Sequence, residues 1–155
     1  MKGGMTGNNA IAALERNPGL LSGRLGFIGL PGPDLPTGLD AEPGLPLVIT
    51  EHAGVASVLE PSGRCHVSFG YDLPQQYAGA LDTIVLFVPK ARHALDMQLS
   101  LAGALLADGG HLVLVGEKRE GIAGAARQLQ SLAADARKVD SARHCPEVNS
   151  IRRPG

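Results

Sequence analysis

The sequence predicts an α/β fold, a three-layer doubly wound sheet with mostly parallel strands. Two apolar runs, TIVLFV at 83–88 and HLVLVG at 111–116, each lead through a short polar stretch into a segment with helical periodicity. Continuous apolar strands are typical of parallel sheets buried on both faces, and the helices between them supply the crossovers. We therefore expect strands and helices to alternate, with helices on both faces of the sheet.

The first half of the chain contains one short helix and three strands. Asn8 or Asn9 can cap a helix that ends near Arg16, and the strand RLGFIGL occupies 24–30. Five prolines between positions 31 and 46 exclude a long helix there, so we expect an extended loop. Strands follow at 47–52 and 65–70, with a short helix at 53–60 between them.

The second half repeats a strand and helix alternation. A strand opens at Asp82, and a helix from about Arg92 to Ala107 is predicted because Leu95, Leu99, Ala102 and Leu106 recur at helical spacing. Asp108-Gly109-Gly110 should end that helix and turn the chain into the strand at 111–116. A further helix at about 122–133 and a strand at 138–145 complete the pattern.

Length and composition limit the function. We expect one domain over 1–155, with an N-terminal helix and arm at about 1–19 and an unstructured or cloning-derived tail at about 148–155. The formal net charge of −1 does not favour binding to a polyanion by the whole-molecule field. No stretch approaches the ~20 apolar residues of a membrane span, and the start lacks a secretory signal, so we expect a cytoplasmic protein without membrane contact.

Three segments carry a family resemblance: DTIVLFVPK at 82–90, LVLVGEKREG at 112–121 and KVDSARHC at 138–145. With the helices between them they resemble the N-terminal domain of the bacterial 16S rRNA guanine-N2 methyltransferase family. The similarity covers about 81–145 well, whereas 20–80 agrees by element order and the short DLP at 34–36.

The resemblance implies a class I S-adenosylmethionine (SAM) methyltransferase-like, Rossmann-like fold with the sheet order 3-2-1-4-5-7-6. It also implies that this chain is the first, motif-depleted copy of a duplicated methyltransferase fold. SAM would then bind in the catalytic C-terminal domain of the same parent chain. That domain is the implied partner, together with rRNA of the small ribosomal subunit, and a homodimer is open. In that sheet order Cys65 and Cys145 are expected near opposite edges, both as buried reduced thiols.

The positions where the cofactor should bind hold atypical residues. Gly29 and Gly32 follow the first strand, but Pro31 and Pro33 remove two backbone donors from the loop. Glu51 stands where an acidic residue holds the ribose hydroxyls in related enzymes. We expect these three residues, Gly29, Gly32 and Glu51, to be vestigial and this domain to bind no cofactor.

The end of the fourth strand lacks the expected catalytic motif. Amino methyltransferases of similar fold carry Asn-Pro-Pro followed by Phe or Tyr, whereas Phe87, Val88, Pro89 and Lys90 stand here. Phe87 cannot accept a hydrogen bond from an exocyclic amine. The five histidines show no metal-ligand spacing, and neither cysteine lies in a CxxC pair. We expect no catalytic residue and no metal site.

Four basic residues follow two neighbouring strands. Lys90 and Arg92 come after the fourth strand, and Lys118 and Arg119 come after the fifth. Parallel strands end at the same edge of a sheet, so these residues are candidates for contacts with RNA phosphates. Ordinary solvated loop charge, partly neutralised by Glu117 and Glu120, is the alternative.

Three other functions stay open at this point. The chain can be a small active SAM-dependent methyltransferase with atypical motifs, or a pure docking or dimerisation domain. A nicotinamide-dependent protein is the third, but the first strand does not lead into G-x-G-x-x-G.

Overall fold

Seven strands form one sheet in the order β3-β2-β1-β4-β5-β7-β6. The computed structural model describes residues 11–12, 14–16, 19, 21, 23–36, 44–89, 92–116, 135–140 and 147–152, with the backbone alone for Arg92 and the last two stretches. The strands are β1 (Leu25–Ile28), β2 (Leu47–Thr50), β3 (His66–Phe69), β4 (Leu81–Phe87), β5 (Leu106–Gly116), β6 (Asp135–Asp140) and β7 (Glu147–Arg152).

Five of these strands pair in parallel, and of the other two only β7 runs in the opposite direction, because β6 is antiparallel to β7. β3, β2, β1, β4 and β5 pair in parallel, while β7 pairs antiparallel with both β5 and β6. The expected order and the mostly parallel sheet are therefore confirmed. Because the parallel strands run in register, their carboxyl ends meet along one edge of the sheet, which we call the carboxyl edge.

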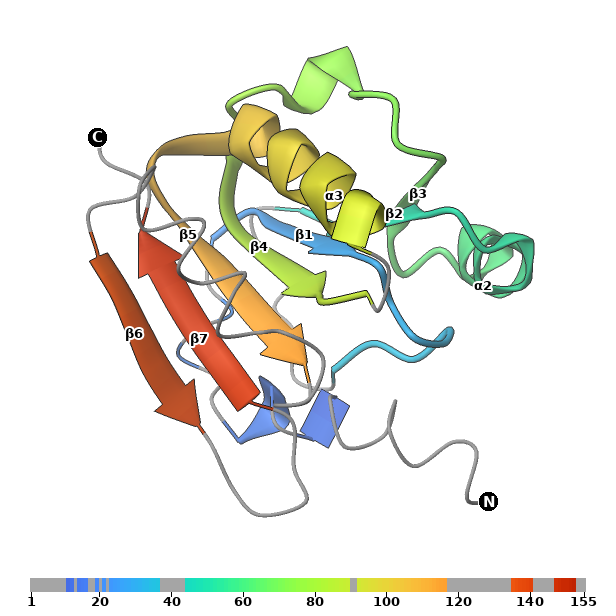
Figure 1. Cartoon of the computed structure of the whole chain (residues 1–155). Coiled ribbons are helices and arrows are strands. Elements are labelled where there is room, and N and C mark those ends of the chain that lie inside the picture. Colours follow the sequence, from blue (N-terminus) through green and yellow to red (C-terminus); the bar gives the residue numbers. More distant parts are fainter. Residues whose placement is uncertain are drawn as a thin grey trace.

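Helices cover both faces of the sheet. After β1, the described helical elements are α2 (Ala53–Leu59), η3 (Glu60–Ser62), η4 (Gln75–Tyr77) and α3 (Arg92–Leu105). α3 crosses one face over β4 and β1 (Figure 1). Helical residues at 11–12 and 14–15 contribute to the core of the opposite face together with α2, as the predicted first helix requires. The described part of the Pro-rich stretch, 31–36 and 44–46, contains no helix.

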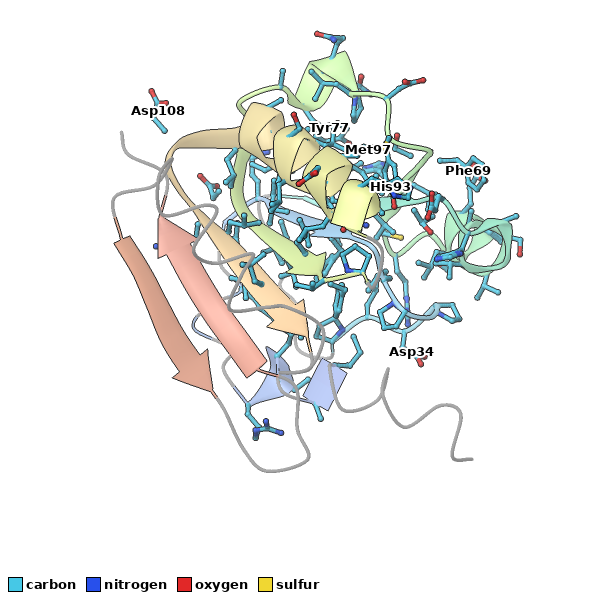
Figure 2. All side chains as sticks on the ribbon, in the orientation of Figure 1. Asp34, Phe69, Tyr77, His93, Met97 and Asp108 are labelled. Carbon is cyan, nitrogen blue, oxygen red and sulfur yellow. The ribbon has the colours of Figure 1, made fainter. Side chains whose placement is uncertain are left out.

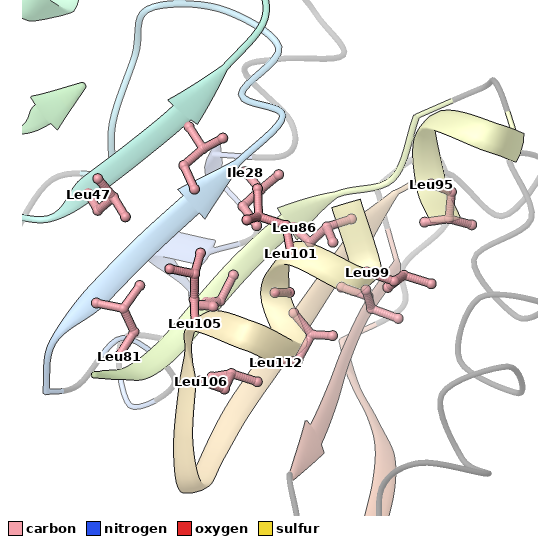
Figure 3. Close-up of a cluster of buried hydrophobic side chains, with 14 of the residues drawn as sticks. Ile28, Leu47, Leu81, Leu86, Leu95, Leu99, Leu101, Leu105, Leu106 and Leu112 are labelled. Carbon is pink, nitrogen blue, oxygen red and sulfur yellow. The ribbon is translucent and has the colours of Figure 1, made fainter. Parts of the chain in front are cut away.

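The alternation of side chains along the strands divides the core into two clusters. Ile84 and Leu86 of β4 pack with α3, whereas Val85 and Phe87 pack with α2 and the N-terminal helical residues. Leucines from α3 and the strands dominate the first cluster (Figure 3). Strands with apolar residues on both faces are the expected consequence of covering both sides of a parallel sheet.

The junction between α3 and β5 differs from the prediction. α3 ends at Leu105, and Asp108-Gly109-Gly110 lies inside β5. Leu81 of β4 pairs with Leu106 of β5, and the next pair joins Thr83 to His111. The additional residues of β5 between these two pairs form a bulge. A Cβ on Gly110 would lie 2.9 Å from the Ala107 carbonyl oxygen, which explains why a glycine stands at this position.

The C-terminal prediction was wrong over 148–152. These residues lie in β7, which is inserted between β5 and β6 rather than forming a tail. β6 contains Lys138 to Asp140 of the predicted strand but begins at Asp135. The predicted helix at 122–133 and the rest of the predicted strand, 141–145, lie outside the described residues.

Candidate functional site

The carboxyl ends of β1, β2 and β3 converge on one short stretch of the carboxyl edge. Gly29 directly follows β1, Glu51 follows β2, and Gly70 with Tyr71 follows β3. Backbone hydrogen bonds extend the ladder beyond the strands, because the N–H of Gly29 donates to the Ile49 carbonyl at 3.2 Å and that of Gly70 donates to the Thr50 carbonyl at 2.8 Å. The three loops are therefore held side by side.

The two glycines of the loop after β1 differ in their surroundings. Gly29 adopts φ +78°, and a Cβ there would meet both Gln98 Nε2 and the Phe87 carbonyl oxygen at 3.0 Å. Gly32 has nothing within 4 Å of its would-be Cβ. Gly29 is therefore required by backbone conformation and close packing, while Gly32 is not.

The side chain that covers Gly29 belongs to α3. Gln98 is 2% exposed, and its Nε2 donates to the Tyr71 hydroxyl at 3.0 Å. Its Oε1 is buried without a hydrogen-bond partner among the described residues. A SAM site needs bare backbone after the first strand, whereas here the Gln98 carboxamide lies against the backbone of Gly29.

Tyr71 connects Gln98 to Glu51. Burial raises the pKa of the Tyr71 phenol, the hydrogen bond from Gln98 lowers it, and the charge and hydrogen bonding of the Glu51 carboxylate raise it again. Glu51 itself is exposed. The Glu51 carboxylate, which sequence analysis expected to be vestigial, thus lies close enough to Tyr71 to affect the pKa of its phenol.

The end of β4 places no polar side chain at this edge. Phe87 is buried in the cluster beneath α2, and Val88 is buried against α3. The Val88 N–H donates to the Val115 carbonyl at 2.9 Å, which ties the end of β4 to β5. Neither of these two side chains carries a group that accepts a hydrogen bond from an exocyclic amine.

The four basic candidates cannot be placed as a cluster. Lys90, Lys118 and Arg119 lie outside the described residues, and Arg92 opens α3 with only its backbone described. Phe87 of β4 pairs with Val115 of β5, so the two segments that carry these residues leave adjacent strand ends. Their role as an RNA contact stays a prediction.

The histidines and cysteines give no second site in the part of the chain that the structure describes. No group of three or more His, Cys, Asp or Glu residues there could hold a metal ion. His52, His66 and His93 are exposed, and His144 lies outside the described residues. Cys65 is buried and free as expected, and burial raises the pKa of its thiol while Arg64 lowers it; Cys145 is not described.

Sequence analysis missed Gln98 and Tyr71. One signal was available, because Gln98 follows Leu95 by three residues and precedes Ala102 by four, which places a polar residue on the buried face of α3. The partner of such a residue depends on the tertiary fold. No periodicity in the loop after β3 marks Tyr71.

Sheet order, carboxyl edge and layer arrangement define the class I SAM-dependent methyltransferase fold. A solved structure of this class, the T. thermophilus 16S rRNA N2 G1207 methyltransferase in complex with AdoMet and guanosine, superposes with a TM-score of 0.69 at 21% identity, covering 94% of this chain and 39% of that one. The SAM-dependent O-methyltransferase of Thermotoga maritima gives a TM-score of 0.63 at 12% identity, with 94% of this chain and 64% of that one covered.

Within that class, the chain belongs to the family described as methyltransferase small domain N-terminal, whose model matches residues 12–146. Ribosomal RNA small subunit methyltransferase C of Pseudomonas syringae pv. tomato is 42% identical over 132 residues, or 85% of this chain. The protein of the same name from Stutzerimonas stutzeri is 45% identical over 134 residues. The chain spans 37% of the length of each of these two relatives.

Among the described helices, none is long and apolar enough to span a membrane.

Proposed function

We propose that this chain is the N-terminal, non-catalytic module of a SAM-dependent rRNA guanine-N2 methyltransferase. One observation carries the proposal: Gln98 covers the backbone of Gly29, where the cofactor would have to bind. The end of β4 supports it, since Phe87 and Val88 are buried in the core instead of presenting polar groups.

The module acts within a longer cytoplasmic chain. Its relatives are more than twice as long as the matched region, so the remaining length can hold the catalytic domain that binds SAM. The module would support folding of that domain, which is its main partner. Guanine in 16S rRNA would be the methyl acceptor of the whole protein, and base choice would lie in the catalytic domain.

Calorimetric titration of the purified chain with SAM and with S-adenosylhomocysteine tests this proposal. We expect no saturable heat at millimolar ligand. Micromolar binding would favour the alternative, a small active methyltransferase with atypical motifs. A methyl-transfer assay on 16S rRNA with the chain alone should likewise give no product.

RNA positioning is the second part of the proposed role. Lys90, Arg92, Lys118 and Arg119 follow β4 and β5, and would contact phosphates from that side of the carboxyl edge. The ends of β2 and β3 carry the exposed acids Glu51 and Asp72 instead, which repel phosphates. Any RNA contact should therefore be confined to the β4 and β5 side.

A charge-matched pair of variants tests the RNA contact. Lys90→Ala/Arg92→Ala removes two positive charges from the carboxyl edge. Arg24→Ala/Arg64→Ala removes two positive charges from the opposite edge, where these exposed arginines precede β1 and β3. Fluorescence anisotropy with a 16S rRNA fragment at low salt should show weaker binding for the first pair alone. Equal binding by both pairs would overturn this part of the proposal.

The docking alternative is favoured by one surface feature. Phe69 of the edge strand β3 is 60% exposed (Figure 2). Val58 of α2 is 53% exposed, so β3 and α2 both present apolar side chains to solvent. Sedimentation velocity over a wide concentration range tests for a homodimer. A dimer that Phe69→Ser converts to a monomer would support docking, while a monomer at all concentrations would remove it.

A further inference from the structure

Three neighbouring strand ends are connected by one sequence of side-chain contacts at the carboxyl edge. Gln98 packs over Gly29 after β1, its Nε2 donates to Tyr71 after β3, and the Glu51 carboxylate after β2 raises the pKa of the Tyr71 phenol. In open α/β sheets this edge is where ligands bind. Here the protein's own side chains join the three loops that a ligand would contact.

We propose that Gln98 and Tyr71 are internal occupants of a closed nucleoside site. They fill the space over the end of β1, so that the fold is complete without a ligand. The inference rests on the proposed non-catalytic function, because an enzyme would keep this space free for its cofactor.

The burial of Gln98 supports this assignment. The residue is 2% exposed although it carries a carboxamide, and it lies on the same helix face as Leu95, Leu99 and Ala102 of the apolar cluster. A leucine or methionine would fill such a position without polar atoms to satisfy. The surroundings at its tip are polar instead, namely the Tyr71 hydroxyl and the backbone of Gly29 and Phe87.

The unpaired oxygen is the second supporting observation. Oε1 of Gln98 is buried and finds no donor among the described residues, although buried polar atoms are paired in most native structures. Only part of the hydrogen-bonding capacity of the carboxamide is therefore used by the described residues. An unpaired buried oxygen is what we expect of a side chain that fills the space over Gly29 without having its own binding partner there.

A double variant should open the site. Tyr71→Ala/Gln98→Ala removes both occupants, while Tyr77→Ala/Met97→Ala is a matched control. The control residues come from the segment after β3 and from α3, and Met97 is 49% exposed (Figure 2). Adenosine and S-adenosylhomocysteine are the probes, followed by the Gly29 amide signal in ¹H–¹⁵N spectra and by calorimetry.

We expect saturable adenosine binding by the double variant, with a dissociation constant on the order of 1 mM, and none by the wild type or the control. A folded double variant that binds neither probe would overturn this inference and leave the proposed function intact. Binding of S-adenosylhomocysteine by the wild type would instead overturn the proposed function.

A smaller change keeps the inference testable if the double variant does not fold. Gln98→Ala removes only the carboxamide and leaves a cavity lined by polar groups, which acetamide can enter. Acetamide should raise the melting temperature of Gln98→Ala but not that of the wild type or of Met97→Ala. Equal responses of all three proteins, or a wild-type Gly29 signal that shifts with adenosine, would show that Gln98 does not close the site.

Discussion

Gly29 is constrained both by its backbone conformation and by the side chain that packs over it. Its φ of +78° is a left-handed conformation that L residues rarely adopt, and its Cα lies under the Gln98 carboxamide and the Phe87 carbonyl. Sequence analysis assigned Gly29 and Gly32 to the same loop function. The structure separates them, since only Gly29 is constrained.

Gly29→Ala should destabilise the domain while Gly32→Ala should not. The left-handed backbone alone costs about 1–2 kcal/mol for a residue with a Cβ, and the new methyl group would also press on Gln98. Gly32→Ala meets nothing within 4 Å, so its effect should stay within about 0.5 kcal/mol. Urea unfolding of both variants measures the difference, and equal midpoints would contradict the assigned geometry.

Tyr71 should make the domain sensitive to alkaline pH. Its folded pKa is raised above the ordinary value of 10.0, mainly by burial, so the neutral phenol is the form that stabilises the fold. This contribution is complete below the unfolded pKa and is lost as pH rises through the folded pKa. Melting temperatures from about pH 8 to about pH 11 should therefore fall more steeply for the wild type than for Tyr71→Phe.

The comparison isolates Tyr71 because the other alkaline groups are shared by both proteins. Cys65, whose pKa burial also raises, contributes equally to the two curves. Parallel curves would show that ionisation of the Tyr71 phenol does not lower the stability of the folded state.

At the scale of elements, β7 determines how the sheet ends. It pairs with β5 through six residue pairs from His111 to Gly116 and also holds β6. Among the described strands β6 has no other partner. Loss of β7 would therefore expose the outer edge of β5 and release β6.

Truncation should reveal this dependence. A chain that ends at Pro146 lacks β7 and should unfold without cooperativity or aggregate, because an unpaired central strand edge is open to other chains. A chain that ends at Arg152 keeps every β7 pair and should unfold like the full sequence. Size-exclusion chromatography and urea unfolding compare the two, and a cooperative, monomeric shorter chain would contradict the role assigned to β7.

β7 also shows a limit of prediction from the sequence. Continuous apolar runs identified β1, β2, β4 and the main part of β5, because their burial on both faces is visible in the residues themselves. In EVNSIR, by contrast, Val148 and Ile151 are three residues apart, which is not the alternation of a strand. β7 exists because β5 and β6 offer it partners, and that is a property of the assembled sheet.

The bulge in β5 and the site on the carboxyl edge both depend on contacts between residues that are distant in the sequence. Asp108-Gly109-Gly110 is a turn by its local propensity, and it lies inside β5 because the flanking residues Leu106 and His111 pair with β4. The Gln98–Tyr71 contact joins residues 27 positions apart. Sequence analysis could exclude the catalytic motif at 87–90, but it could not find which side chains close the cofactor position.

For the whole molecule, we expect that SAM does not change the stability of this methyltransferase fold. A ligand that binds only the folded state stabilises it by RT ln(1 + [L]/Kd), about 2.7 kcal/mol at a hundred times Kd. At about 1 mM SAM, the urea midpoint of this chain should stay unchanged, whereas that of a full-length relative should rise. A rise for this chain would mean that the Gln98 carboxamide yields to the cofactor. The closed edge would then be one state of a binding site, and the Tyr71→Ala/Gln98→Ala variant should bind SAM more tightly than the wild type because no side chain has to be displaced.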